Sequence, residues 1–164
     1  GLMMPDFDKH FYVQTDASGE AMGAVLSQIV DGQEHPCHYI SKRLNSSQRN
    51  YSTTEREALA IHWAVMKFET YLKGRRITLN TDHQPLIYLK KTPSVNRRVA
   101  KWQLQLDEFD FKVKYRPGRK NGNADALSRP AGTGKEVYYL TPAGRELCLE
   151  HFPAAKFPKL PPWK

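Results

Sequence analysis

The alternation of apolar and polar positions predicts one long helix near the middle of the chain, over residues 51–72. Apolar side chains recur there at steps of three and four residues, which places them on one stripe that packs against a sheet. Ser52 and Glu55 match the Ser-x-x-Glu pattern of a capping box at the helix start, and Gly74 is typical of a helix end. The stripe consists of Ala58, Ile61, Val65, Phe68 and Leu72.

Glu57 is an acidic residue on or beside this apolar stripe. A carboxylate in such a position costs free energy unless it is paired or binds a metal ion. Two other interpretations stay open from the residues alone. Glu57 could complete a second capping pattern with Thr54, or it could be a first-turn acid favoured by the helix dipole.

Five stretches carry the pattern of strands, at residues 11–16, 22–30, 35–41, 76–82 and 109–115. Asp31-Gly32 is a hairpin signal between the second and third strands, so an antiparallel meander is the simplest arrangement of the first three. Shorter helices are expected at residues 84–90, 95–106 and 123–129. In the second of these, the side chains predicted to point inward are Val99, Trp102 and Leu106.

Two strands end in the same dipeptide, Thr15-Asp16 and Thr81-Asp82. The long helix lies between these strands in the sequence, and a strand–helix–strand order predicts a right-handed crossover with parallel pairing. Parallel strands end at a common edge of the sheet. We therefore expect both aspartates at that edge.

Four acids together suggest a metal site: Asp16 and Asp82 at strand ends, Glu57 in the long helix, and Asp125 in the last short helix. Clustered carboxylate oxygens are the ligands that Mg²⁺ takes, with water or phosphate oxygens in the remaining positions. A pair of such ions can activate a water and stabilise the leaving oxygen of a phosphodiester. Taken singly, each acid fits a surface, turn or capping role better than a metal site, and the set of four needs further support.

The net charge of +8 is unevenly distributed along the chain. Residues 1–70 carry six Lys or Arg against nine Asp or Glu, whereas residues 71–164 carry nineteen against eight. Residues 90–101 and 112–120 each hold five basic side chains and no acidic one, as expected of a surface that meets phosphates. A solvated lysine-rich face is the alternative. The residues predicted to hold nucleic acid are Lys90, Lys91, Arg97, Arg98, Lys101 and Trp102.

The two cysteines, Cys37 and Cys148, favour neither a disulfide framework nor a structural zinc site, because they are far apart and lack metal-type spacing. His35, Cys37 and His38 lie close in sequence, but alternate strand residues point to opposite faces, which disfavours a shared metal. No signal peptide or membrane-spanning run is recognisable. A soluble intracellular protein without membrane partners is the expectation.

Six motifs carry a resemblance to a known family, and they occur in order between about Pro5 and Pro130. The motifs are Thr15-Asp-Ala-Ser18, Gly23-Ala-Val-Leu-Ser-Gln28, Tyr51-Ser-Thr-Thr-Glu-Arg-Glu-Ala-Leu-Ala-Ile61, Thr81-Asp-His83, Tyr115-Arg-Pro-Gly118 and Asn123-Ala-Asp-Ala-Leu-Ser-Arg129. With these motifs the chain resembles the ribonuclease H domain of the reverse transcriptase polyprotein of gypsy/Ty3-type long-terminal-repeat retrotransposons.

The resemblance implies an α/β ribonuclease H-like fold, a mixed five-stranded sheet flanked by helices, over residues 1–130. Residues 131–164 are expected to form a linker and a C-terminal extension of unknown role. By the same resemblance, Asp16, Glu57, Asp82 and Asp125 bind two Mg²⁺ ions, with Mn²⁺ as a substitute. The implied reaction is hydrolysis of the RNA strand of an RNA/DNA hybrid during reverse transcription.

The implied partners are the hybrid and a reverse transcriptase polymerase domain of the same polyprotein. The implied location is the cytoplasm, including virus-like particles, with the nucleus as an alternative. One departure from many ribonucleases H is the lack of a histidine before the last aspartate, where this chain has residues 118–122. The lack of this histidine predicts slower or altered catalytic turnover rather than inactivity. His83 is expected to be structural or to contact substrate.

Two other functions stay open at this stage. A domesticated copy could keep the fold and bind hybrids or structured RNA without cutting them, although retention of all four acids disfavours this. A structural tether within a larger polymerase is the third alternative.

Overall fold

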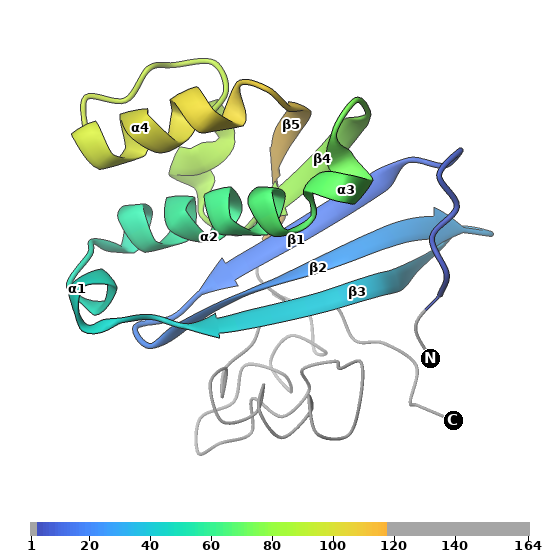
Figure 1. Cartoon of the computed structure of the whole chain (residues 1–164), viewed down its shortest axis with the longest axis horizontal. Helices are drawn as coiled ribbons and strands as arrows, with labels where there is room; N and C mark the ends of the chain where they lie inside the picture. Colours follow the sequence, from blue (N-terminus) through green and yellow to red (C-terminus); the bar gives the residue numbers. More distant parts are fainter. Residues whose placement is uncertain (1–2, 118–164) are drawn as a thin grey trace.

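The computed structural model describes residues 3–117, and these form one mixed five-stranded sheet with helices on one face (Figure 1). The strands are β1 (Phe11–Ala17), β2 (Ala21–Val30), β3 (Gln33–Arg43), β4 (Arg76–Thr81) and β5 (Asp110–Tyr115). Their spatial order is β3-β2-β1-β4-β5. The first three pair antiparallel, whereas β4 is parallel to both β1 and β5. All five predicted strands and the expected fold class are thereby confirmed.

The turn between β2 and β3 has positive φ at both of its central residues, 52° at Asp31 and 76° at Gly32. These angles belong to the tight hairpin turn that Asp-Gly favours, because glycine adopts positive φ without strain. The turn therefore sets the register of β3 on β2 from the Val30–Gln33 pair as far as Ser27, beyond which the register shifts.

Replacing Gly32 by alanine is expected to lower the free energy of unfolding by about 1–2 kcal/mol, the cost of holding an L-residue in the left-handed region. A Cβ atom at Gly32 would meet no heavy atom within 4 Å, so the loss comes from the backbone alone. Gly19→Ala is the matched control, because Gly19 has the same open surroundings and no positive φ. Urea unfolding of both variants measures the loss. Equal urea midpoints for Gly32→Ala and Gly19→Ala would contradict the prediction.

The helices lie over one face of the sheet (Figure 1). They are α1 (Ser46–Arg49), α2 (Thr53–Lys67), α3 (Glu69–Leu72), the 3₁₀ helix η1 (Gln84–Tyr88) and α4 (Arg97–Leu106). α2 lies on β1 and β2, and α4 packs against α2 (Figure 1). The predicted stripe on α2 and α3 is buried, with exposed fractions of 0–1%. The inward prediction for α4 is also confirmed, because Val99, Trp102 and Leu106 are buried.

The predicted helix over residues 51–72 is not continuous, which corrects that expectation. The helix is interrupted at Phe68, which follows the last residue of α2 and precedes the first residue of α3. No glycine or proline marks the position. The Phe68 ring is fully buried and contacts the rings of His38 and Tyr71, at 5.7 Å and 6.5 Å between centroids. Because His38 belongs to β3, a tertiary contact accompanies the break, and local propensity does not reveal it.

Two smaller predictions also change. Residues 84–90 contain a 3₁₀ helix that ends at Tyr88 rather than an α-helix. The helix expected from residue 95 begins at Arg97, after the cap residue Asn96, and Val95 is fully exposed. Short α1 was not predicted, although Asn45 and Gln48 form a capping box there. Within the part of the chain that the structure describes, no helix has the length and apolarity to span a bilayer.

Stability is expected to fall as the pH drops, because burial lowers the pKa of His38 below its ordinary value of 6.5. The unfolded chain then binds the proton more tightly, so the stabilisation is complete above about pH 6.5 and is lost as the pH falls toward the folded pKa. A His38→Gln variant should lose less stability than the wild type between about pH 7.5 and 5.5. Thermal unfolding at both pH values measures this. If His38→Gln lost as much stability as the wild type between these two pH values, the prediction would be wrong.

Candidate active site

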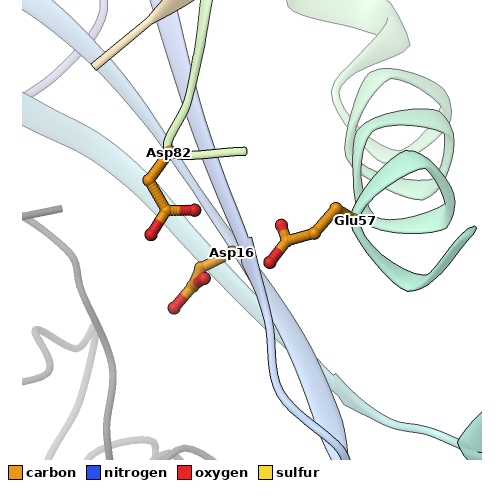
Figure 2. Close-up of side chains that lie close together, drawn as sticks. All are labelled: Asp16, Glu57 and Asp82. Carbon is orange, nitrogen blue, oxygen red and sulfur yellow. The ribbon is translucent and has the colours of Figure 1, made fainter. Parts of the chain in front are cut away.

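Three carboxylates meet at the edge of the sheet where β1 and β4 end. Asp16 lies in β1, Asp82 directly follows β4, and Glu57 projects from α2 (Figure 2). One carboxylate oxygen from each residue lies within 4.8 Å of the others. Asp16 and Glu57 are buried, with exposed fractions of 4% and 3%, and Asp82 is half-buried.

The two aspartates come together through strand register. β1 and β4 are parallel, and Gln14 of β1 stands opposite Asn80 of β4. Asp16 and Asp82 each follow this pair by two residues, so they occupy equivalent places at the common edge. The parallel pairing predicted from the repeated Thr-Asp dipeptide is therefore confirmed.

The first turn of α2 decides between the open interpretations of Glu57. Ser52 is the cap residue: its hydroxyl accepts from the backbone N–H of Glu55 at 3.2 Å, and its own N–H donates to the Glu55 carboxylate at 3.1 Å. The capping acid is thus Glu55. Glu57 instead turns into the buried cluster, toward Asp16 (Figure 2).

The donor set of this cluster fits a hard divalent cation. Three like charges at such short range repel one another, and a bound cation offsets that repulsion. Carboxylate oxygens at 4.8 Å or less can converge on one ion such as Mg²⁺. Asp125, the fourth predicted ligand, lies outside the described residues, as do the predicted helix over residues 123–129 and the segment 131–164.

Four of the predicted nucleic-acid-binding residues are exposed: Lys91, Arg97, Arg98 and Lys101. Arg97 and Lys101 belong to α4, and Lys91 follows η1. A groove of about 420 Å³ lies between these two elements and the first turn of α2, with Thr54, Tyr88 and Val95 among its lining residues.

Lys90 and Arg98 also have partners within the protein, and Trp102 is buried. The Lys90 ammonium donates to the carbonyl of Leu106, the last residue of α4, at 3.1 Å and to the carbonyl of Phe109, just before β5, at 2.7 Å. Arg98 forms an ion pair with Glu55 and lies over the Tyr51 ring, 3.9 Å from its centroid. Trp102 is 9% exposed, so its ring is not available for base stacking.

Similarity to known proteins agrees with this geometry. Residues 6–109 match the family described as the RNase H-like domain found in reverse transcriptase. The Pol polyprotein of transposon 412 from Drosophila melanogaster is 44% identical over 128 residues, covering 78% of this chain and 10% of the relative. The corresponding polyprotein of transposon gypsy, also from Drosophila melanogaster, is 44% identical over 129 residues, covering 78% and 12%. The chain therefore spans about a tenth of these relatives.

Solved structures support the fold. A foamy viral protease-reverse transcriptase in complex with an RNA/DNA hybrid superposes with a TM-score of 0.56 at 17% identity, over 85% of this chain and 19% of that chain. RNase H1 from Halobacterium salinarum superposes with a TM-score of 0.50 at 18% identity, over 73% of this chain and 92% of that chain. With the match over residues 6–109, these findings confirm the resemblance, and the chain belongs to the family of RNase H-like domains of reverse transcriptases.

Proposed function

We propose that this chain is a metal-dependent endonuclease that hydrolyses the RNA strand of RNA/DNA hybrids during reverse transcription. The observation that carries the proposal is the buried cluster of Asp16, Glu57 and Asp82. In this proposal the three residues, with Asp125, hold two Mg²⁺ ions, for which Mn²⁺ can substitute. Bound divalent ions supply an activated water and stabilise the leaving oxygen of the phosphodiester.

The chain's own residues would hold the reacting groups in place. Asp16 and Glu57 are fixed in a strand and a helix, so their carboxylates need little reorganisation before reaction. Asp82 is the most accessible of the three, which suits the side of the site that faces the phosphate. Hydrolysis would leave 5′-phosphate and 3′-hydroxyl ends.

Choice of the RNA strand would depend on contacts to 2′-hydroxyls across the wide minor groove, while basic residues hold phosphates of the DNA strand. Lys91, Arg97, Arg98 and Lys101 are the exposed candidates for that hold. The hybrid bound by the foamy viral relative supports this substrate class. The proposed partner is a reverse transcriptase polymerase domain, which the Pol polyprotein relatives support. The proposed site of action is the cytoplasm.

Removing one phosphate contact should weaken hybrid binding and its salt dependence together. We expect Arg97→Gln to reduce the slope of log K against log [salt] by about 1, because one fewer counterion is released. Fluorescence anisotropy with a labelled hybrid measures the slope. Arg76→Gln is the control, since Arg76 is also exposed but sits on β4 beside Asp110. Equal slopes for Arg97→Gln and the wild type would exclude Arg97 from the interface.

Cleavage of a strand-labelled RNA/DNA hybrid, in Mg²⁺ and in Mn²⁺, tests the proposed function. We expect cutting of the RNA strand only, no cutting of duplex RNA, and loss of cutting in Asp82→Asn. Asp107→Asn, which alters an exposed acid at the end of α4, should cut like the wild type. Tight hybrid binding without cutting in either metal would overturn the proposal and favour a binding module.

A further inference from the structure

Thr54 and His83 share a hydrogen bond of 2.8 Å between Oγ1 and Nε2. The two residues are 29 positions apart and belong to different elements. Thr54 lies in the first turn of α2, and His83 follows Asp82 at the end of β4. The bond therefore connects the helix that carries Glu57 with the loop that carries Asp82.

At its β4 end, the hydrogen bond holds the turn that contains Asp82. The backbone N–H of His83 donates to the hydroxyl of Thr81 at 3.1 Å, and Thr81 is fully buried. The His83 carbonyl accepts from the N–H of Leu86 at 3.0 Å, which ties the same residue to η1. With its imidazole held by Thr54, His83 is fixed through backbone and side chain, and Asp82 lies between two anchored neighbours.

On the α2 side, the bond ends one helical turn before Glu57. Residues three apart lie on the same side of a helix, so Thr54 and Glu57 are neighbours on its surface. This turn is held independently by the Ser52–Glu55 capping box and by the ion pair of Glu55 with Arg98 of α4. Thr54 thus offers His83 a rigid attachment point beside the acidic cluster.

Asp82 needs such support more than the other two acids do. Asp16 is paired within the sheet, opposite Gly23 of β2, and Glu57 belongs to a fifteen-residue helix. The pairing of β4 ends at Thr81, one residue before Asp82. Repulsion among three carboxylates also acts to push Asp82 outward when no cation is present.

We propose that Thr54 and His83 are positioning residues, whose hydrogen bond sets the separation of the Glu57 and Asp82 carboxylates for binding a divalent cation. This inference rests on the proposed function. Neither residue is assigned contact with the reacting atoms. Residues that orient metal ligands typically contribute about 10- to 100-fold to metal affinity or activity, and we expect an effect of that size here.

The same chain supplies a matched control. His10 and Thr78 share a hydrogen bond between the same two atom types, also at 2.8 Å, near the opposite ends of β1 and β4. Removing the hydroxyl from either threonine breaks one His–Thr bond with little change in shape. Only the bond at Thr54 adjoins the carboxylates, so the two variants separate a positioning effect from a stability effect.

The test compares Thr54→Val with Thr78→Val by calorimetric titration with Mn²⁺ and by hybrid cleavage. We expect Thr54→Val to lower Mn²⁺ affinity and the cleavage rate about 10- to 100-fold, with Thr54→Ser restoring both. Thr78→Val should change only the unfolding midpoint. His83→Ala should resemble Thr54→Val, and the double variant should lose no more than either single one, because they break the same bond.

Two outcomes overturn the inference: Mn²⁺ affinity in Thr54→Val equal to that in Thr78→Val, or a wild type that binds no Mn²⁺ at all. A wild type that binds Mn²⁺ but cuts no hybrid overturns the proposed function alone. In that case the Mn²⁺ titrations of the two threonine variants still decide whether Thr54 and His83 position the acids.

Discussion

Asp16→Asn is expected to lower the rate of hybrid cleavage at least about a hundredfold, which corresponds to about 2.7 kcal/mol of lost transition-state stabilisation. Asp16 is buried at 4% exposure and belongs to the cluster whose oxygens lie within 4.8 Å. The substitution keeps the size of the side chain and removes one charged oxygen ligand. Metal ions typically contribute several kcal/mol to such reactions, so a loss of this size is reasonable.

Metal-dependent stability gives a second measure of the same change. A ligand that binds only the folded state stabilises it by about 2.7 kcal/mol at a hundred times its dissociation constant. The wild type should therefore unfold at a higher temperature in Mn²⁺ than in chelator, whereas Asp16→Asn should show little difference. Asp107→Asn serves as control, because that acid is exposed and caps the end of α4. If Asp16→Asn kept both the rate and the Mn²⁺ response, Asp16 would not be a ligand.

Phe68→Ala is expected to lower the free energy of unfolding by about 3–5 kcal/mol, the usual cost of truncating a buried phenylalanine. The ring is fully buried between α2, α3 and β3, where it contacts His38 and Tyr71. Deleting it leaves a cavity at the position where the helix breaks. A domain of this size is typically stable by only about 5–15 kcal/mol, so the variant would be near unfolding.

Urea unfolding followed by circular dichroism measures this loss. Phe68→Leu should lose less, because the leucine fills part of the space and remains apolar. Leu104→Ala provides the surface control, since Leu104 of α4 is 72% exposed and its truncation should change stability by no more than about 0.5 kcal/mol. Equal losses in Phe68→Ala and Leu104→Ala would show that Phe68 does not hold the corner between α2 and α3.

Within residues 90–101, not every basic side chain is directed only toward solvent. The run from Lys90 to Lys101 contains five basic residues, yet Lys90 and Arg98 direct their charged groups to protein partners. Lys90 stabilises the end of α4, and Arg98 joins α4 to the first turn of α2. Long basic side chains near helix ends often serve such structural roles. Charge alone therefore does not separate a phosphate contact from an internal one.

Local patterns in the sequence determined the elements that build the site. Alternation located the strands, the Ser52–Glu55 pair located the start of α2, and Asp31-Gly32 located the hairpin. These signals work because capping bonds, turn angles and one-sided burial involve residues close in sequence. The repeated Thr-Asp dipeptide with a helix between its copies then sufficed to bring Asp16 and Asp82 to one edge. The place of Asp125 stays a prediction.

Tertiary structure alone decided where the long helix breaks, which basic residues have partners within the protein, and which histidine lies next to the first turn of α2. The break at Phe68 accompanies contact with a ring on β3, and Lys90 finds its carbonyl partners 16 and 19 residues away. His83 meets Thr54 across 29 positions. Such contacts depend on how helices settle on the sheet, because packing free energy is summed over many distant neighbours. No local pattern of residues specifies them.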